Sequence, residues 1–159
     1  MSIQAVRTYF EQFGIADLIL EFEVSSATVE LAAAALDCEP ALIAKSLTFS
    51  TADGPVMIVA AGDAKVDNAK YKAHFGEKAK MLKGDEVEVL IGHAIGGVCP
   101  FGVKEGVRVW LDESLRRFEH IYPACGSSNS AIKLTPDQLM TYSRALGWCD
   151  VTKLPEVQA

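Results

Sequence analysis

Two apolar runs in the middle of the chain are separated by only a short turn. They are "AKSLTFST" (residues 44–51) and "PVMIVAAG" (residues 55–62), with Ala52-Asp53-Gly54 between them. Val, Ile, Thr and Phe are enriched in β-strands, and a short connection that contains Asp-Gly is typical of a hairpin. The chain must therefore accommodate an antiparallel strand pair at its centre, and its other elements must cover that pair.

The segments on both sides of this hairpin alternate between helical and extended patterns. Apolar spacing, caps and breakers predict helices over 2–13, 27–36, 67–75, 84–90 and 135–146, and strands over 18–22, 107–112, 117–124 and 130–134. The candidate N-caps are Ser2, Ser25 or Ser26, and Thr135, with Pro136 in the first turn of the last helix. We expect a mixed α/β (α+β) fold: a single compact domain, residues 1–159, with a mixed, mostly antiparallel sheet flanked by helices.

Composition supports one domain with a real core. The chain has 159 residues, of which 50% are hydrophobic and 23% charged. Its longest apolar runs are far shorter than the roughly 20 residues of a membrane-spanning helix, and its N-terminus has neither a basic start nor an apolar signal core. We expect a soluble, cytoplasmic protein with no membrane partner. The cysteines show no C-x-x-C spacing and are expected to be reduced thiols: Cys38, Cys99, Cys125 and Cys149.

The overall charge hides a local exception. A net charge of −6 argues against a protein that coats nucleic acid indiscriminately, and no DNA partner is expected. Between residues 65 and 83, however, six lysines stand against the acidic residues Asp67 and Glu77; they are Lys65, Lys70, Lys72, Lys78, Lys80 and Lys83. This strip is either a solvated surface or a docking surface for a phosphodiester backbone.

The stretch "IGHAIGGVCPFGVKEGVRVWL" (residues 91–111) contains five glycines around one Cys-Pro pair. It does not match the phosphate-binding loop, since Lys104 follows Gly102 by two positions and is followed by Glu105. The dinucleotide-binding glycine pattern is also missing. What remains is G-G-x-x-P-x-G from Gly96 to Gly102, a loop in which main-chain groups can approach a ligand closely.

Other polar and aromatic residues allow alternative chemistries. Cys99 could pair with His93 or His120 as a cysteine hydrolase, although no recognisable elbow or helix N-terminus activates the thiol. The histidines, His74 included, are too dispersed to suggest a metal site, so no metal or other cofactor is implied. The aromatic residues Trp110, Tyr122 and Trp148 are expected to pack in the core rather than to stack on bases.

Several segments, taken in order, resemble the family that includes the YbaK proteins and the editing domain inserted in bacterial prolyl-tRNA synthetases. The resemblance covers about residues 25–146 and depends on "IAKSLTF", "VMIVAAGDAKVDNAKYKAHFG", "KAKMLKGDEVEVLIGHAIGGVCPFG", "VRVWLDESLRRFEHIYPACGSS" and "IKLTPDQL". It implies a YbaK-like fold and hydrolysis of the ester between a tRNA, usually the proline tRNA, and a wrongly attached small amino acid. The glycine loop would then hold the terminal adenosine and the aminoacyl ester.

The resemblance also implies the site. Lys45, together with the main chain at Gly96 and Gly97, would be catalytic: the lysine would bind the ester carbonyl or the terminal phosphate, and the loop would orient water and the ribose hydroxyl. The substrate-binding residues would be Ser46, Ala60, His93, Cys99, Pro100, Gly102, Gly126 and Ser127. The tRNA-binding residues would be Lys65, Lys70, Lys72, Lys80 and Lys83.

The expected protein is thus a freestanding aminoacyl-tRNA deacylase that partners with tRNA and with prolyl-tRNA synthetase or the elongation machinery. Ser46 stands where similar members carry asparagine or threonine, so the amino acid to be removed stays open between Ala, Cys, Ser, Thr and 2-aminobutyrate. Two alternatives remain: a non-catalytic tRNA- or synthetase-binding module of the same fold, and a hydrolase of another small acyl ester. Neither matched motif contains an obvious general base, which points to the ribose hydroxyl of the substrate as the proton acceptor.

Overall fold

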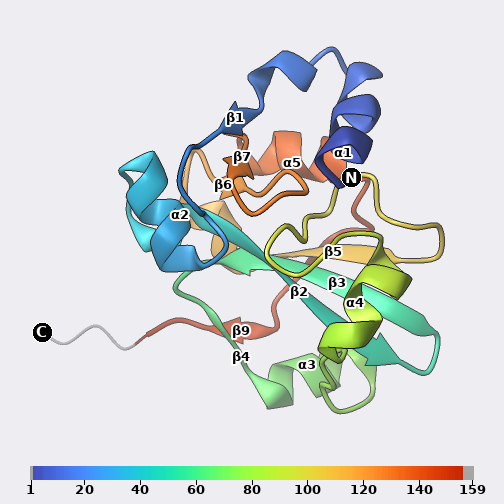
Figure 1. Ribbon diagram of the computed structural model, residues 1–159. Helices are drawn as coiled ribbons and strands as arrows, with labels where there is room; N and C mark the ends of the chain where they lie inside the picture. The colour runs from blue at the N-terminus through green and yellow to red at the C-terminus, as the bar shows by residue number, and fades with distance from the viewer. Residues whose placement is uncertain (1, 156–159) are drawn as a thin grey trace, which may run out of the picture.

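The computed structural model describes residues 2–155 and is built on a five-stranded sheet with the order β6-β2-β3-β5-β8 (Figure 1). Two small two-stranded sheets, β1-β7 and β4-β9, lie beside it. The strands are β1 (Leu20–Glu21), β2 (Ile43–Thr51), β3 (Gly54–Ala61), β4 (Lys65–Val66), β5 (Arg108–Asp112), β6 (Tyr122–Pro123), β7 (Ser130–Ala131), β8 (Trp148–Cys149) and β9 (Thr152–Lys153).

The predicted hairpin is confirmed as the longest ladder in the protein. β2 and β3 pair antiparallel from Ala44↔Ala61 to Thr51↔Gly54. The short β6 joins the other edge of β2 in parallel, while β5 joins β3 and β8 joins β5, also in parallel. The five-stranded sheet is therefore mixed, as predicted. Its antiparallel pairing comes from the hairpin, and each of the two small sheets is an antiparallel pair as well.

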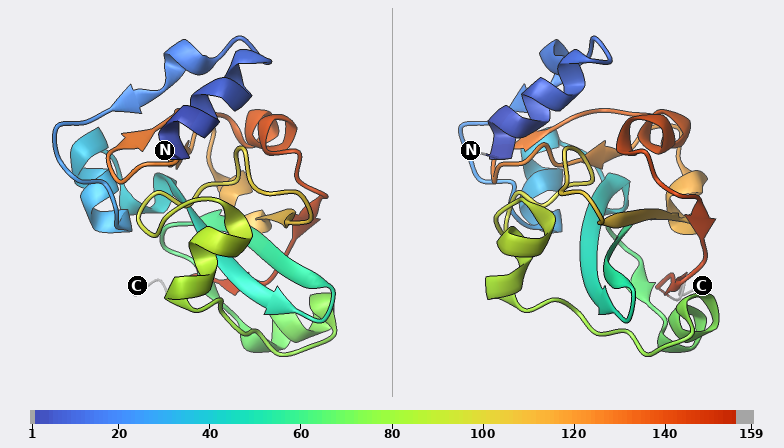
Figure 2. Two further views of the ribbon diagram at one scale, coloured as in Figure 1. Left: turned by 45° about the vertical axis from the view of Figure 1, so that its right-hand side comes forward. Right: turned by 90° about the vertical axis from the view of Figure 1, so that its right-hand side faces the viewer.

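Within residues 2–155, five α-helices surround the sheet: α1 (Ser2–Glu11), α2 (Val29–Leu36), α3 (Asn68–Phe75), α4 (Gly84–Ile91) and α5 (Pro136–Ser143). Helices α1, α4 and α5 contribute to the large core on one face of the sheet, through Val6, Val87 and Leu139 among others. Helix α3 covers the opposite face with Tyr71. Figure 2 shows the hairpin between these two layers, and α2 packs separately near Ile43.

Local sequence signals explain where most helices begin. The side chains of Thr28, Asp67 and Thr135 cap α2, α3 and α5 by accepting a hydrogen bond from the main-chain N–H three residues later. Helices α3 and α4 end at Gly76 and Gly92, which adopt the left-handed conformation that glycine favours. The predicted helices over 67–75 and 84–90 are therefore confirmed.

Some predicted boundaries are wrong. Thr28, rather than Ser25 or Ser26, caps α2, and the last helix ends at Ser143 instead of about residue 146. The predicted strand over 117–124 is reduced to the two residues of β6, and its first residue, Arg117, instead ends the 3-10 helix η3 (Glu113–Arg117), which Asp112 caps.

Two further properties concern the part of the chain that the structure describes. None of its helices is both long and apolar enough to cross a membrane. Its four cysteines are free thiols, and three of them, Cys99, Cys125 and Cys149, are buried.

Candidate functional site

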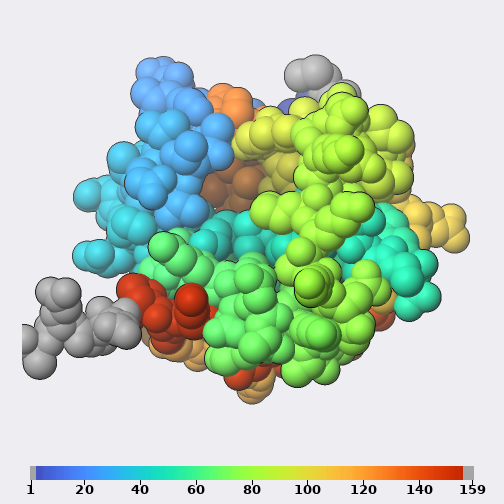
Figure 3. Space-filling model, turned by 90° about the horizontal axis from the view of Figure 1, so that it is seen from below, coloured from blue at the N-terminus to red at the C-terminus, as the bar shows by residue number. Residues whose placement is uncertain are grey.

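A cavity of about 370 Å³ opens beside the edge of β2, between α2, the start of α4 and the loop that follows α4. Figure 3 shows a hollow between the blue segment that carries α2 and the yellow-green segments that carry α4 and the following loop. Most of the lining is apolar, as in small-molecule sites generally. The polar side chains of the lining are Ser26, Thr28, Lys45, Ser46, Thr48, Tyr122 and Ser130.

The cavity lies where the edge of β2 is open. The ladder with β6 ends at Ala44, and the segment before α4 covers the strand again from Thr48, whose carbonyl accepts from the N–H of Leu82. The N–H of Ser50 donates in the same direction, to Lys80. Because main-chain groups alternate sides along a strand, the N–H and C=O of Ser46 point to this open edge. The cavity therefore has main-chain donor and acceptor groups at its floor.

Lys45 stands next to this opening, on the other face of β2 from the Ser46 side chain. Its ammonium group donates to the carbonyls of Gly62 (3.3 Å) and Ala64, in the turn that follows β3. The side chain is half-buried, and burial lowers the pKa of its ammonium group, while the nearby Asp63 and Glu30 oppose that shift. Lys45 is thus a positioned cation at the rim of an apolar cavity.

The turn that receives Lys45 is fixed from two sides. Gly62 has no room for a side chain, because a Cβ there would lie 2.1 Å from the carbonyl oxygen of Pro40. Asp63 forms an ion pair with Arg117 at 2.6 Å, and this hydrogen bond holds the pKa of the Asp63 carboxyl below its usual range. The carbonyls of the turn are therefore held in place under Lys45. The sequence analysis did not predict that this turn holds Lys45. The only sequence feature that could have indicated it is the Gly62-Asp63 pair immediately after a buried strand.

The glycine loop forms the opposite wall of the cavity. Ile95, Gly96 and Val98 line it, and Ile95 is 68% exposed at its mouth. Gly96 has φ +95°, a conformation that favours glycine. Gly97 lies against the 124–130 loop, since a Cβ on Gly97 would lie 2.7 Å from main-chain atoms of Gly126 and Ser127. The glycine loop and the 124–130 loop, which carries the predicted residues Gly126 and Ser127, therefore pack directly against each other.

The rest of the same loop faces the core. His93 and Cys99 are both fully buried, with Cys99 Sγ 3.5 Å from His93 Nε2. His93 Nε2 donates to the carbonyl of Phe101 at 2.7 Å, and burial lowers the pKa of the imidazole. Burial also raises the pKa of the Cys99 thiol to about 12. A neutral imidazole beside a protonated, inaccessible thiol does not provide the activated thiolate that a cysteine hydrolase requires.

The structure thus sorts the predicted site residues into three groups. Lys45, Ser46 and Gly96 line the cavity, whereas Gly97, Gly126 and Ser127 support the loop from behind. The remaining residues do not line it: Ala60, His93, Cys99 and Pro100 are buried, and Gly102 lies near α1, with its Cβ position 3.5 Å from the Ala5 carbonyl. Direct substrate contact does not agree with the geometry, because the four buried residues are enclosed by the core and the half-buried Gly102 lies beside α1, away from the cavity lining.

The predicted positions of the aromatic residues agree with the structure only in part. Trp110 packs against the smaller core and His74, as expected. Tyr122, expected in the core, is half-buried and lines the cavity. Among the described residues, no group of three His, Cys, Asp or Glu could hold a metal ion. The cavity lining contains no Asp, Glu or His within residues 2–155.

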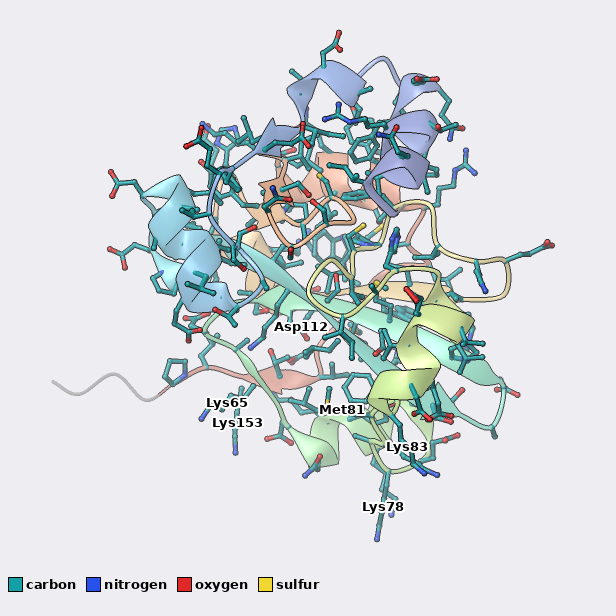
Figure 4. The ribbon with its side chains drawn as sticks, in the orientation of Figure 1. Lys65, Lys78, Met81, Lys83, Asp112 and Lys153 are labelled. Carbon is teal, nitrogen blue, oxygen red and sulfur yellow. The ribbon has the colours of Figure 1, made fainter. Side chains whose placement is uncertain are left out.

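The lysine strip lies on the lower face in Figure 4, where the labelled Lys65, Lys78 and Lys83 point away from the fold. Figure 3 views that same face, and the cavity is visible on it. One lysine differs from the rest: Lys70 forms an ion pair with Asp150 at 3.1 Å and donates to the carbonyl of Thr152. The predicted strip is therefore partly a structural contact and partly an exposed cationic surface near the cavity.

Sequence comparison identifies the family. The family model described as "Aminoacyl-tRNA editing domain" matches residues 23–142, and the chain therefore belongs to this family. The match includes β2, the glycine loop and the 124–130 loop, which together enclose the cavity.

Individual relatives agree with this assignment. The chain is 51% identical over 154 residues to the uncharacterised protein YwhH of Bacillus subtilis, covering 96% of this chain and 98% of that protein. It is 32% identical over 90 residues to proline--tRNA ligase of Thermotoga maritima, covering 56% of this chain and only 15% of the ligase. A crystal structure described as that of a candidate trans-editing enzyme for prolyl tRNA synthetase superposes with TM-score 0.86 at 29% identity, covering 96% of this chain and 97% of that one.

Proposed function

We propose that the protein hydrolyses the ester bond of mischarged aminoacyl-tRNA, acting in the cytoplasm on tRNA charged by another protein. The observation that carries this proposal is the cavity at the open edge of β2, where a positioned cation, Lys45, and main-chain groups of Ser46 and Gly96 surround one space. An aminoacyl ester is already activated. Its hydrolysis therefore requires mainly positioning and stabilisation of the developing oxyanion.

In the proposed reaction, water attacks the ester carbonyl carbon and a tetrahedral oxyanion forms. Collapse of this intermediate breaks the bond to the ribose oxygen, which leaves with a proton, and releases the free amino acid and the tRNA hydroxyl. The Ser46 N–H at the open strand edge and the Lys45 ammonium group are the donors available to the oxyanion. Lys45 reaches the substrate by exchanging its contacts with the turn carbonyls for the ester or the terminal phosphate.

The proton acceptor is assigned to the substrate. The lining contains no carboxylate or imidazole among the described residues, and His93, on the core side of the loop that follows α4, is fully buried. The neighbouring ribose hydroxyl, held by the main chain around Gly96, is the remaining group that can relay a proton from water. The mechanism is therefore substrate-assisted hydrolysis.

The lining also bears on the amino acid. Apolar residues and a few hydroxyls surround about 370 Å³, and part of that space must receive the terminal ribose. A small amino acid on the proline tRNA is the proposed substrate, in agreement with the similarity to proline--tRNA ligases. Ser46 and Thr48 place hydroxyl groups on one wall, so both apolar and hydroxylated small side chains can be accommodated.

A deacylation panel tests the proposal. Proline tRNA charged with alanine, cysteine, serine, threonine or 2-aminobutyrate is incubated with the protein, and ester loss is compared with uncatalysed hydrolysis. We expect acceleration for one or more of these substrates and none for correctly charged prolyl-tRNA. Uncatalysed rates with every member of the panel would contradict the proposal.

A second substrate comparison tests the mechanism. Aminoacyl-tRNA whose terminal adenosine lacks the hydroxyl beside the ester should bind with similar affinity but be deacylated much more slowly. Single-turnover rates are required, because KM alone mixes binding with chemistry. Equal rates for the two substrates would mean that a protein side chain acts as the base.

One observation favours the alternative of a binding module without catalysis. The Lys45 ammonium group is already engaged by two main-chain carbonyls, which would leave the cavity without a free cation if that contact persisted in the complex. A binding module would retain affinity for charged tRNA and protect the ester. Slower ester loss in the presence of the protein than in buffer would identify this function.

A further inference from the structure

The C-terminal part of the described chain places one lysine directly opposite another. In the antiparallel pair of β4 and β9, Lys65 is the partner of Lys153, and Val66 is the partner of Thr152. Thr152 is buried and Val66 packs against the smaller core, so alternation along the strands turns both lysine side chains outward. Figure 4 shows the two labelled side chains next to each other, pointing the same way.

This arrangement is unfavourable for the protein on its own. Like charges at directly opposite positions of an antiparallel pair destabilise it. Within residues 2–155, neither Lys65 nor Lys153 forms a side-chain hydrogen bond or ion pair that would offset the repulsion. Near the pair in sequence, Asp63 and Asp150 are paired with Arg117 and Lys70, and Asp67 accepts a hydrogen bond from the main-chain N–H of Lys70. An anion placed between the two ammonium groups would convert the repulsion into attraction.

A buried carboxylate holds Lys153 in this position. Asp112 is fully buried and accepts hydrogen bonds from the N–H of Val151 at 2.9 Å and the hydroxyl of Thr152 at 2.6 Å. The N–H of Ser114 donates to the same carboxylate at 2.9 Å. The contacts from Val151 and Thr152 fix the segment that leads into β9, which lies outside the residues that the family model matches, while the contact from Ser114 ties the same carboxylate to η3. The position of Lys153 is therefore set by the fold of this chain rather than by a loose terminus.

The lysine pair is also close to the cavity along the chain. The carbonyl of Ala64 accepts from the Lys45 ammonium group at the cavity rim, and Lys65 is the next residue. Both lysines of the pair extend toward the face on which the cavity opens (Figures 3 and 4). A polyanion whose end lies in the cavity can therefore pass over the pair.

We propose that Lys65 and Lys153 together bind a backbone phosphate in the single-stranded 3′ end of the tRNA whose terminal ester occupies the cavity. This inference rests on the proposed function, which supplies an RNA end at the cavity. It adds a phosphate site that depends on the C-terminal segment, with Asp112 as its positioning residue.

Binding of uncharged RNA tests the pair without requiring catalysis. The probe is a short, labelled, single-stranded RNA ending in CCA, and its affinity is measured at several salt concentrations for the wild type, Lys65→Gln and Lys153→Gln. We expect each substitution to weaken binding severalfold and to reduce the slope of log K against log salt by up to about 0.7, the value for the one phosphate that the two lysines share. Lys133→Gln, an exposed lysine in the segment between β7 and α5, is the matched control and should change neither quantity.

Stability distinguishes ligand binding from a structural role. Because the pair is repulsive without a ligand, Lys153→Gln should leave the melting temperature unchanged or raise it while weakening RNA binding. Thr152→Val, which keeps both charges but removes a hydrogen bond to Asp112, should weaken binding through misplacement of Lys153. An unchanged affinity and salt slope in Lys153→Gln would overturn the inference.

The experiments distinguish failure of the deacylase proposal from failure of the phosphate site. If the wild type binds the RNA through the pair but accelerates no ester hydrolysis, the deacylase proposal falls and the phosphate site stands. If hydrolysis of charged tRNA is observed and Lys65→Gln and Lys153→Gln leave RNA affinity and its salt slope unchanged, the phosphate site falls and the deacylase proposal stands.

Discussion

The loop that follows α4 has two sides, which differ both in residue chemistry and in access to the cavity. One side, with Ile95, Gly96 and Val98, forms a wall of the cavity and presents no reactive side chain. The other side carries His93 and Cys99, a combination that supports nucleophilic catalysis in many enzymes, yet both are fully buried. A reactive residue type inside a glycine-rich loop is therefore no guide to chemistry until its access to substrate is known.

The two sides also differ in electrostatics. On the cavity side, Lys45 lies next to Asp63 and Glu30, which favour its charged form against the cost of burial. On the core side, burial suppresses ionisation of both the thiol and the imidazole. The cavity is thus the place where charge can act on a substrate, whereas the core side contributes packing. Each prediction below tests one half of this comparison.

The largest effect is expected at Lys45. Lys45→Ala should abolish deacylation while the fold persists, because the loss of one preorganised charge contact costs about 2 to 4 kcal/mol in the transition state. Single-turnover deacylation measures the effect, with circular dichroism to verify folding. Lys45→Met, which preserves the apolar stem, should be equally inactive. A folded variant with turnover close to that of the wild type would remove Lys45 from the mechanism.

The next effect concerns the support of the cavity wall. In Gly97→Ala the new Cβ would lie 2.7 Å from main-chain atoms of Gly126 and Ser127, so the two loops must separate. We expect deacylation to fall by about 10- to 100-fold, since misplacement by about 1 Å can cost 100-fold. Gly106→Ala is the control, because its φ of +93° makes the substitution strained but no atom lies within 4 Å. Equal activity in the two variants would show that contact between the loops does not matter.

A smaller effect, on stability alone, is expected on the core side of the loop. Cys99→Ala should retain most deacylase activity and lose about 1 kcal/mol of unfolding free energy, because a buried sulfur is replaced by a small void. Urea denaturation and steady-state kinetics measure the two quantities. Mass spectrometry that found an acyl group trapped on the Cys99 thiol would contradict the assignment of this side to the core.

The smallest effect is a pH dependence of stability due to His93. Burial lowers the pKa of the folded-state imidazole, so its contribution is complete above the unfolded-state value of about 6.5 and is lost as pH falls through the folded-state pKa. Between pH 7.5 and 5, the melting temperature of the wild type should fall by about 2 to 4 °C more than that of His93→Gln. Parallel pH profiles would show that His93 does not couple folding to protonation.

The sequence determined most of the framework through local and periodic signals. The hairpin followed from two β-rich runs and an Asp-Gly turn, and α5 followed from Thr135-Pro136, whose cap and first-turn geometry depend only on neighbouring residues. The family could also be recognised from the sequence, because its motifs lie in order along residues 23–142. Lys45 was assigned from the family resemblance, and its place in an apolar strand agreed with that assignment.

Only the tertiary structure decided which side of the glycine loop is accessible. The burial of His93 and Cys99 depends on helices α1 and α4 and on Phe101, which pack behind the loop, and no spacing within the loop encodes that contact. The open edge at Ser46 likewise results from β6 and the segment before α4 covering β2 on either side of it. Lys153 lies opposite Lys65 in the pair of β4 and β9 because Asp112, which is distant in sequence, accepts a hydrogen bond from Thr152 and so holds β9 in place. Periodicity reports which face of an element is apolar, but contacts between residues far apart in sequence determine which of those faces a substrate can reach.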